Sequence, residues 1–552
     1  MTRKESIENA QRKVIQMKKH LKNVVDSSND SEINYYTSLV MGLAGHPLLV
    51  HDLFGPSVIL SNSNESQLKN WLPKVQNSEI IVAYAQTELG HGTNLKMLET
   101  TATYDPNIEQ FEIHSPTITS TKFWPGNLGI SANYVILQAQ LFTLGKCYGP
   151  HLFIVQIRDL ETHKALPGIR IGDIGPKFEC NLMDNGYLSF DHVRIPRTHM
   201  LMKHCQVLND GTYIKPKHTK LGYSTMVEVR AFLLEKNAMH IAQACTIAIR
   251  YSCIRRQGKI DPTKDIEAKI LEYQTQQFRI FPHLARAFAY LATGRRIIDF
   301  SRNVLKDIRS GRLGLINELH AISSGLKAVI TFNTSLAIEQ CRLACGGHGY
   351  SLASGLPQLY AIVVAGCTYE GENLVMLLQM ARYLMKKERT RIELKQDVNI
   401  FDELLDNDFC EIDASYKESL DMFKALANRK ITDVYDRLEI LKKQGKKEEY
   451  AWNECAVDLC RASRAYCRNF IAHIFVQYVN QIQEPALRHL LEEILKMFLN
   501  FEITECSADL IEIGYMNGQK LVKVRNELNE VLPFHQKYLG TLKNKKLEHS
   551  KL

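Results

Sequence analysis

The chain has 552 residues, of which 45% are apolar and 23% are charged, and its formal net charge is +8. This length is too great for one hydrophobic core and predicts a globular protein of three or four structural units. No apolar run approaches the roughly 18 residues that a membrane span needs, so we expect none. The positive charge is spread along the chain, which favours a small phosphorylated ligand over nucleic acid without requiring either.

Residues 1–82 are predicted to form an N-terminal helical domain. Apolar residues recur there at helical spacing with lysines between them: Ile7, Val14, Met17, Leu21 and Val24. Such a stripe resembles a mitochondrial presequence, but Glu5 and Glu8 argue against that interpretation. An ordinary surface helix is the better prediction.

Residues 83–215 are predicted to form a β-domain. Seven of the sixteen prolines lie between Pro106 and Pro196, and proline disrupts helix interiors. Polar and apolar residues alternate there, as in strands, at Phe111–His114, Leu188–Asp191 and Val193–Ile195. The domain opens with the glycine-rich segment Tyr84–Asn94, whose backbone N–H groups and threonine hydroxyls suit a planar or anionic ligand.

Residues 216–390 are predicted to form a helical bundle. Leu326–Ala344 and Leu374–Met385 are apolar at helical spacing, and the charged stretch Lys386–Gln396 suggests a linker or a solvated helix end. Residues 391–552 are expected to form a further helical domain. The segment Cys345–Tyr350, which follows the helix predicted at Leu326–Ala344, is a glycine cluster. It serves either as a helix cap or as a close approach to a phosphate-bearing ligand.

Thr368–Asn373 places Glu370 after an apolar run and before a helix. Apolar surroundings raise the proton affinity of a carboxylate, as a general base requires. Glu372 suits the first helical turn, where a carboxylate favours the positive end of the dipole. From the local pattern alone, two ordinary helix-start acids are at least as probable as a catalytic base.

The thirteen cysteines include no C-x-x-C pair, and we interpret them as reduced thiols in a reducing compartment. His91 and His348 have no partners at metal-ligand spacing, so no metal is expected. The final residues, Ser550, Lys551 and Leu552, match the address that the peroxisomal import receptor recognises. This ending predicts the peroxisome matrix as the location.

Together these motifs resemble those of peroxisomal acyl-CoA oxidases, members of the acyl-CoA dehydrogenase superfamily. The resemblance covers roughly residues 80 to 387 and continues more loosely to the terminus. It rests on these segments: Tyr84–Asn94, Thr117–Gly129, Ile174–Lys177, Asn185–Tyr187, Gln274–Gln277, Cys345–Tyr350 and Thr368–Asn373.

The resemblance implies a mainly α, α+β multidomain fold. It consists of an N-terminal helical domain, a central β-domain of barrel or sandwich type, and two C-terminal helical bundles. It also implies a homodimer, with a heterodimer of related subunits as an alternative, and FAD near the subunit interface. The implied reaction oxidises a fatty acyl-CoA to trans-2-enoyl-CoA and reduces molecular oxygen to hydrogen peroxide, the first step of peroxisomal fatty acid β-oxidation.

The site residues follow from the same resemblance. Glu370 matches the catalytic base that removes the α-proton, and Thr87 and Gly126 match flavin-binding positions. Arg255 is similar to an arginine that reaches the flavin pyrophosphate across the interface. The remaining pair, Gly346 and Gly347, matches a segment near the adenylate half of FAD.

Three departures from the family pattern leave alternatives open. The N-terminal helical segment and the last bundle look shortened, and Asn127 stands where the family usually has a glycine. The shortened ends motivate an inactive paralogue that serves as the partner subunit of a heterodimer, although the retained Glu370 speaks against it. A dehydrogenase that passes electrons to a carrier protein is a third possibility, which the peroxisomal ending disfavours.

Overall fold

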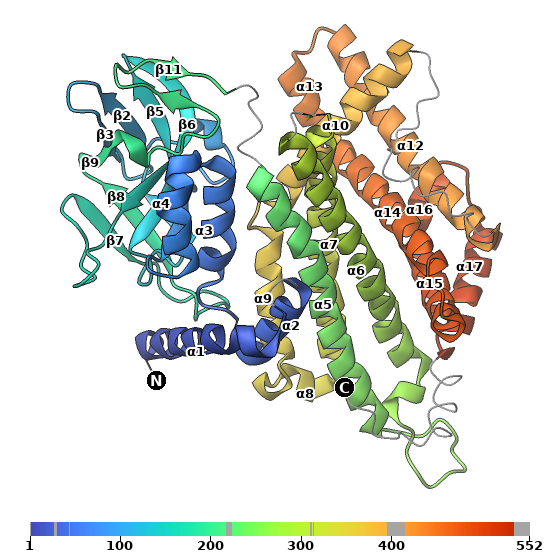
Figure 1. Ribbon diagram of the computed structural model, residues 1–552. Coiled ribbons are helices and arrows are strands. Elements are labelled where there is room, and N and C mark those ends of the chain that lie inside the picture. The colour runs from blue at the N-terminus through green and yellow to red at the C-terminus, as the bar shows by residue number, and fades with distance from the viewer. Residues whose placement is uncertain are drawn as a thin grey trace. The chain divides into compact units, whose positions relative to one another are not determined.

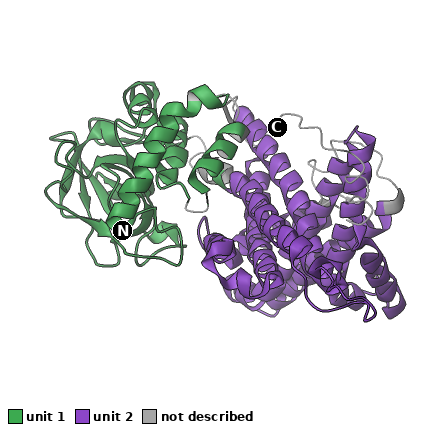
Figure 2. Cartoon of the chain, turned by 90° about the horizontal axis from the view of Figure 1, so that it is seen from below, with its two compact units in different colours: residues 1–229 green, residues 230–552 purple. Residues whose placement is uncertain are grey.

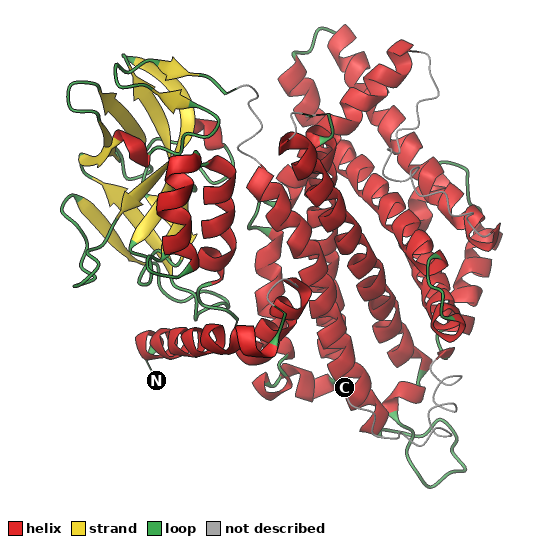
Figure 3. Ribbon diagram, in the orientation of Figure 1, coloured by secondary structure: helices red, strands yellow, loops and turns green. Residues whose placement is uncertain are grey.

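A computed structural model describes residues 2–26, 30–42, 45–216, 224–309, 312, 314–394 and 414–534. The chain divides into two compact units, residues 1–229 and 230–552 (Figure 2). Among the described residues, the strands belong to the first unit and the second unit is helical (Figure 3). The C-terminal tripeptide that carries the predicted peroxisomal address lies outside the described residues.

Within the described residues, the first unit begins with four helices, of which α1 and α4 start with a capping box. Thr2 and Glu5 form a capping box before α1, in which each side chain accepts a hydrogen bond from the other residue's backbone N–H. Val14 and Met17 of α1 pack with Met41, so the predicted amphipathic helix is present. The helices of this unit are α1 (Arg3–Val24), α2 (Asp30–Met41), α3 (Leu49–Asn62) and α4 (Glu65–Gln76).

The β-region contains two main sheets and a small hairpin (Figure 1). In the first sheet β5 pairs antiparallel with β6, and β1 and β2 pair parallel with successive segments of β5; β3 and β9 extend the sheet beyond β2. The second sheet has the order β4-β8-β7, and β10 pairs with β11. The strands are β1 (Val82–Ala85), β2 (Thr101–Asp105), β3 (Gln110–His114), β4 (Lys122–Gly126), β5 (Tyr134–Thr143), β6 (Lys146–Gln156), β7 (Ile169–Asp173), β8 (Asn185–Phe190), β9 (Val193–Pro196), β10 (Gln206–Val207) and β11 (Tyr213–Ile214).

Alternation of apolar residues explains how these strands bury one face. Phe111 and Ile113 of β3 are fully buried, and they pack in one cluster with Phe153 and Leu188. On another face, Ile59 of α3 and other apolar residues of α3 and α4 cover β1 and β5. The strands predicted around Phe111, Leu188 and Val193 are confirmed as β3, β8 and β9.

The second unit is a bundle of long helices in which α7 is central. α7 packs against α6, α9, α10 and α14. Of the described helices, α7 alone has the length and hydropathy of a membrane span, but 72% of that apolar window is buried in the protein. The long helices are α5 (Ser224–Ile254), α6 (Gln274–Arg309), α7 (Ile316–Ala344), α10 (Asn373–Leu394), α12 (Ala414–Lys443), α14 (Ala456–Asn480), α15 (Pro485–Glu505) and α17 (Gly518–Val531); the shorter ones are α8 (Gly346–Tyr350), α9 (Leu356–Val364), α13 (Glu448–Glu454) and α16 (Ser507–Glu512).

A buried ion triad joins three helices of this bundle. Glu502 of α15 accepts hydrogen bonds from Arg286 of α6 at 2.7 Å and from Arg468 of α14 at 2.9 Å. Although burial acts to raise the pKa of Glu502, the two arginines lower it to about 2. The triad links the segments before and after residue 390 within one compact unit, and the predicted four-domain division stays a prediction.

Candidate active site

The glycine-rich segment predicted to contact a ligand follows β1. Thr87 is half-buried there, and its carbonyl accepts a hydrogen bond from Phe123 N–H at 3.0 Å. Among the described residues, its hydroxyl has no hydrogen-bond partner. The backbone of Thr87 is therefore anchored while its side chain remains available to a ligand.

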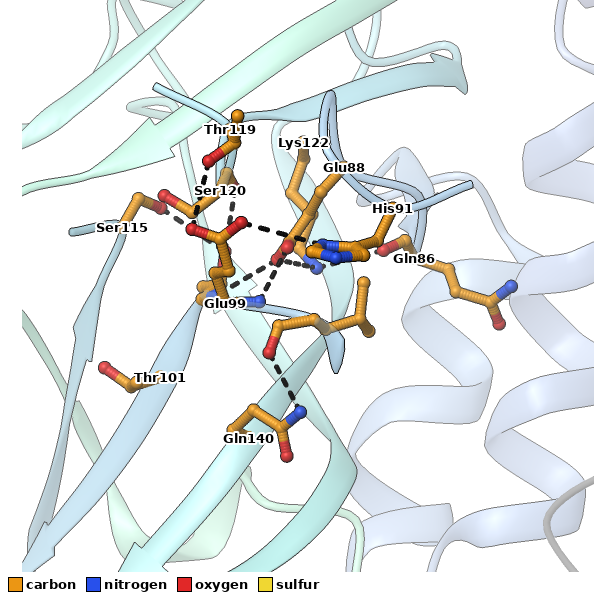
Figure 4. A network of polar contacts seen from close by, with 12 residues as sticks. Gln86, Glu88, His91, Glu99, Thr101, Ser115, Thr119, Ser120, Lys122 and Gln140 are labelled. Carbon is orange, nitrogen blue, oxygen red and sulfur yellow. Dashed lines mark hydrogen bonds and ion pairs between the residues drawn. The ribbon is translucent and has the colours of Figure 1, made fainter. Parts of the chain in front are cut away.

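An ion pair between Lys122 and Glu88 fixes this segment (Figure 4). Lys122 is fully buried, and its Nζ lies 2.9 Å from Glu88 Oε1 and donates to the Gln86 carbonyl at 3.0 Å. The Glu88 carboxylate also accepts from the backbone N–H groups of Glu99 at 2.7 Å and Thr100 at 3.0 Å. Burial lowers the pKa of Lys122 to about 8, and Glu88 partly offsets that effect. These contacts immobilise the backbone on either side of Thr87.

Gly126 ends β4 in a tightly packed position. A Cβ there would lie 2.7 Å from Val50 Cγ2 and 2.8 Å from Met183 Sδ, so only glycine fits without rearrangement. The next residue, Asn127, has φ = 66°, a left-handed conformation that asparagine tolerates better than most residues. Its side chain accepts from His51 N–H at 3.2 Å. The departure at Asn127 thus has a local physical reason, because asparagine adopts this conformation and gains a buried hydrogen bond.

In the second unit, Glu370 lies in a strained turn between α9 and α10. Its φ is 56°, and that of Gly371 is 101°. A left-handed non-glycine residue costs on the order of 1–3 kcal/mol and is found disproportionately at functional sites. A Cβ on Gly371 would lie 2.5 Å from Met376 Cε, so packing as well as φ requires glycine there.

The two neighbouring acids have different environments. The Glu372 carboxylate accepts hydrogen bonds from the N–H groups of Leu374 at 2.9 Å and Val375 at 3.2 Å, which caps α10. No described residue donates a hydrogen bond to the Glu370 carboxylate in this way. Its Oε2 is buried and has no hydrogen-bond partner among the described residues. The structure therefore accounts for Glu372 as a helix cap and leaves the function of Glu370 to be explained.

Burial raises the pKa of Glu370, and the positive charges of Arg230 and Lys327 partly offset that effect. Both cations also bond to the turn itself. Sequence reasoning missed them, because they lie on α5 and α7, far from Glu370 in the chain. The available signal was a single lysine within the apolar run Gly325–Ile330, since lysine is rarely fully buried.

A cavity of about 620 Å³ within the second unit brings together the other predicted residues. Arg255, Gly346 and Gly347 all line it, with Tyr251 and His348. Cys345 is the C-cap residue of α7, and Gly346 follows it with φ = 56°. A Cβ on either glycine would meet nothing within 4 Å. The predicted helix cap is therefore present, and the approach of this backbone to a ligand stays a prediction. An arginine beside exposed backbone suits a phosphate group.

Three possible metal ligands lie close together in the part of the chain that the structure describes: His114, Asp191 and His192. The two imidazole rings stack with centroids 4.0 Å apart, and His192 Nδ1 lies 3.0 Å from Glu112 Oε1. Stacking and the hydrogen bond with Glu112 account for the arrangement of the two histidines. The two histidines weighed from the sequence have other neighbours: His91 lies 3.6 Å from Glu99, and the His348 ring lies 5.6 Å from the Tyr251 ring.

Comparison with known proteins bears on the whole chain. The family profile described as acyl-coenzyme A oxidase N-terminal matches residues 1–81, that of the acyl-CoA oxidase C-alpha1 domain matches 223–385, and that of acyl-CoA oxidase matches 415–536. Peroxisomal acyl-coenzyme A oxidase 1 of Bos taurus is 42% identical over 527 residues, which cover 92% of this chain and 78% of that protein.

Solved structures of acyl-CoA oxidases also match this chain. Acyl-CoA oxidase-1 of Caenorhabditis elegans, complexed with FAD and ATP, has a TM-score of 0.90 at 41% identity and covers 97% of this chain and 81% of its own. Acyl-CoA oxidase-2 of the same organism, bound with FAD, ascaroside-CoA and ATP, has a TM-score of 0.91 at 41% identity, with coverages of 97% and 80%.

Similarity of this extent defines an enzyme of the oxidoreductase class. The chain belongs to the acyl-CoA oxidase family. The family, the fold class and the enzyme class predicted from the sequence are confirmed. The roles of the individual residues stay predictions.

Proposed function

We propose that this protein oxidises fatty acyl-CoA to trans-2-enoyl-CoA in the peroxisome, using FAD, with reduction of oxygen to hydrogen peroxide. Its membership of the acyl-CoA oxidase family supports the reaction, and the FAD and ascaroside-CoA in structures of related oxidases support the ligands. The observation that carries the proposal is the buried Oε2 of Glu370, which has no partner within the described residues.

Glu370 acts as the general base. A proton α to a thioester carbonyl is weakly acidic, so its removal needs a carboxylate with raised proton affinity held in place. Burial supplies the raised pKa, and the strained turn between α9 and α10 supplies the position. The α-proton passes to the Glu370 carboxylate, and the electron pair of the C–H bond becomes part of the new double bond.

The thioester oxygen gains negative charge as the proton leaves, and hydrogen-bond donors stabilise it. No described residue accepts a hydrogen bond from the backbone N–H of Glu370. This donor is therefore free to bind the thioester oxygen beside the base.

The residues that hold FAD in this proposal are those that the family resemblance identifies. Thr87 and Gly126 bind the flavin, Arg255 binds the pyrophosphate, and Gly346 and Gly347 admit the adenylate half. The open cavity around Arg255 and the unpaired Thr87 hydroxyl fit such a ligand. When bound, FAD supplies the acceptor for the β-hydrogen and its electron pair, and transfers the electrons to oxygen.

The assembly and the location are part of the same proposal. The protein forms a homodimer, or a heterodimer with a related subunit, and Ser550, Lys551 and Leu552 direct it into the peroxisome matrix through the import receptor. Sedimentation measures the assembly. A fluorescent fusion with and without the final tripeptide tests the address, and matrix import of the truncated form would disprove its role.

The deciding experiment uses the purified protein. We expect a yellow flavin spectrum, bleaching by acyl-CoA and release of peroxide in air. Glu370→Gln keeps the colour and loses turnover, whereas the matched variant Glu372→Gln, which weakens a helix cap, keeps turnover. Normal turnover by Glu370→Gln disproves the assigned base. Bleaching without peroxide indicates a dehydrogenase, and a colourless, unresponsive protein indicates a partner subunit.

A further inference from the structure

Lys327 is a fully buried lysine whose ammonium group points at the turn that carries Glu370. Its Nζ donates to the Gly371 carbonyl at 2.5 Å and to Asn373 Oδ1 at 3.0 Å. Within the described residues, no carboxylate forms an ion pair with it. Burying an ammonium without a paired anion is costly, so this arrangement needs a functional reason.

The acceptors of Lys327 are themselves fixed. Asn373, the first residue of α10, donates to the Ala328 carbonyl at 3.1 Å and to Thr331 Oγ1 at 3.0 Å. The Thr331 hydroxyl in turn donates to the Lys327 carbonyl at 2.8 Å. The start of α10 is therefore bonded to one turn of α7, and Lys327 lies at the centre of these contacts.

A second cation holds the preceding peptide group. Arg230 of α5 donates from Nε to the Glu370 carbonyl at 3.2 Å and from Nη1 to Ser324 Oγ at 3.2 Å. Two consecutive carbonyls, those of Glu370 and Gly371, thus each accept from a buried cation. Both carbonyls belong to residues with positive φ, where the backbone needs external support.

We propose that Lys327 is a positioning residue for the catalytic base: it locks the Glu370–Gly371 turn through the Gly371 carbonyl and places a positive charge beside the Glu370 carboxylate. This inference rests on the proposed role of Glu370. Loss of Lys327 should affect proton abstraction in two ways, through the geometry of the turn and through the ionisation of the base.

Burial is the largest effect on Lys327 and lowers its pKa to about 8. The charged and titratable groups around it come from two other parts of the unit. Arg230 of α5 lowers the pKa further, and Cys367, Glu370 and Glu372 of the segment between α9 and α10 raise it. The ammonium form therefore predominates below a pH of about 8, where it opposes protonation of Glu370.

The test compares Lys327→Met, which removes the charge and the donor, with Lys327→Gln, which keeps a donor. The rate of flavin bleaching by acyl-CoA without oxygen is measured against pH. We expect Lys327→Met to bleach about 10–100-fold more slowly, as for a misplaced reacting group. In both variants the acidic limb of the rate should move to higher pH by about one unit, because an opposite charge has been removed.

Lys327→Gln should recover part of the bleaching rate, but its acidic limb should stay at the higher pH because the charge is still missing. If Lys327→Met does not fold, the result for Lys327→Gln alone tests the proposal. A limb at the wild-type pH in Lys327→Gln would overturn the proposal, since a merely structural lysine changes the rate at all pH values alike. Ser463→Ala is the matched control: it removes a buried bond of 2.9 Å to the Leu377 carbonyl of α10, away from the turn. It should leave the limb in place.

The outcome for Glu370→Gln separates this inference from the proposed function. If Glu370→Gln bleaches normally, the assignment of the base fails and Lys327 has no base to position. If Glu370→Gln is inactive while the limb stays fixed in the Lys327 variants, only the positioning role fails.

Discussion

The two units each contain a buried carboxylate near a buried lysine, with opposite consequences. In the first unit, Glu88 lies 2.9 Å from Lys122 Nζ and accepts two further hydrogen bonds from backbone N–H groups. In the second unit, Lys327 bonds to backbone and amide oxygens near Glu370, and Glu370 Oε2 has no partner among the described residues.

This difference separates a structural acid from a reactive one. The Glu88 carboxylate accepts from Lys122 and from two backbone N–H groups, so its contacts hold the surrounding backbone in place. The unpaired oxygen of Glu370 is costly in the resting protein but leaves a position where a proton can bind. The two lysines differ in the same way. Lys122 forms an ion pair with Glu88, whereas Lys327 donates to the carbonyl of Gly371 in the turn.

The largest expected effect is on turnover. Glu370→Gln should reduce the rate of flavin bleaching by about 10²–10⁴-fold, the usual contribution of a general base. Its unfolding temperature should not fall, because the substitution removes a buried charge without a directly bonded partner. Anaerobic stopped-flow spectroscopy and thermal unfolding measure the two quantities. A large loss of stability in this variant would contradict the comparison.

Glu88→Gln should show the opposite pattern. It leaves Lys122 buried without its counter-charge, which destabilises a protein by about 3–5 kcal/mol. We expect a lower midpoint for the first unit in chemical denaturation and weaker flavin retention, because the segment around Thr87 loses its anchor. Replacing both partners, as Glu88→Leu with Lys122→Met, should recover part of the stability. Full stability of Glu88→Gln would show that the pair is dispensable.

Much of this arrangement follows from local sequence patterns. The strands around Phe111 and Leu188 alternate with period two, and the apolar stripe of α7 has helical spacing, so both were predictable. The local pattern did not separate Glu370 from Glu372, because both are acids near a helix start, and only the family resemblance singled out Glu370. In the structure, Glu372 accepts from the N–H groups of Leu374 and Val375, whereas Glu370 Oε2 is buried without a partner among the described residues.

Long-range contacts account for what the sequence did not predict. Arg230 and Lys327 lie on two different helices, and only the packing of α5 and α7 brings them to the same turn. Likewise, Arg255 and the glycine pair are about 90 residues apart in the chain, and the cavity that they share forms only in the folded bundle. A resemblance to a family located these residues, but no periodicity does.

The pH dependence gives a smaller effect of defined sign. Burial raises the pKa of Glu370 above its ordinary value of 4.5, and the carboxylate must be ionised to accept the α-proton. Bleaching should therefore be lost as pH falls through a value above 4.5. Because the folded state binds this proton more tightly than the unfolded state, Glu370 lowers stability as pH rises between the two pKa values. Glu370→Gln should abolish that contribution to the pH dependence of stability. If wild-type bleaching is lost only at or below pH 4.5, the raised pKa of Glu370 is contradicted.

The smallest expected effect concerns the cavity of the second unit. Arg255→Ala should weaken FAD binding by about tenfold, the loss of roughly one charge-assisted contact to phosphate. The neighbouring Arg256 provides a matched control, because it donates to the Glu267 carbonyl and does not line the cavity. Arg256→Ala should therefore keep its flavin, as measured by fluorescence after dilution. Equal losses in both variants would mean that general positive charge, rather than the cavity, attracts the cofactor. A selective loss at Arg255 would instead place the phosphate groups in the cavity that Arg255 shares with Gly346 and Gly347.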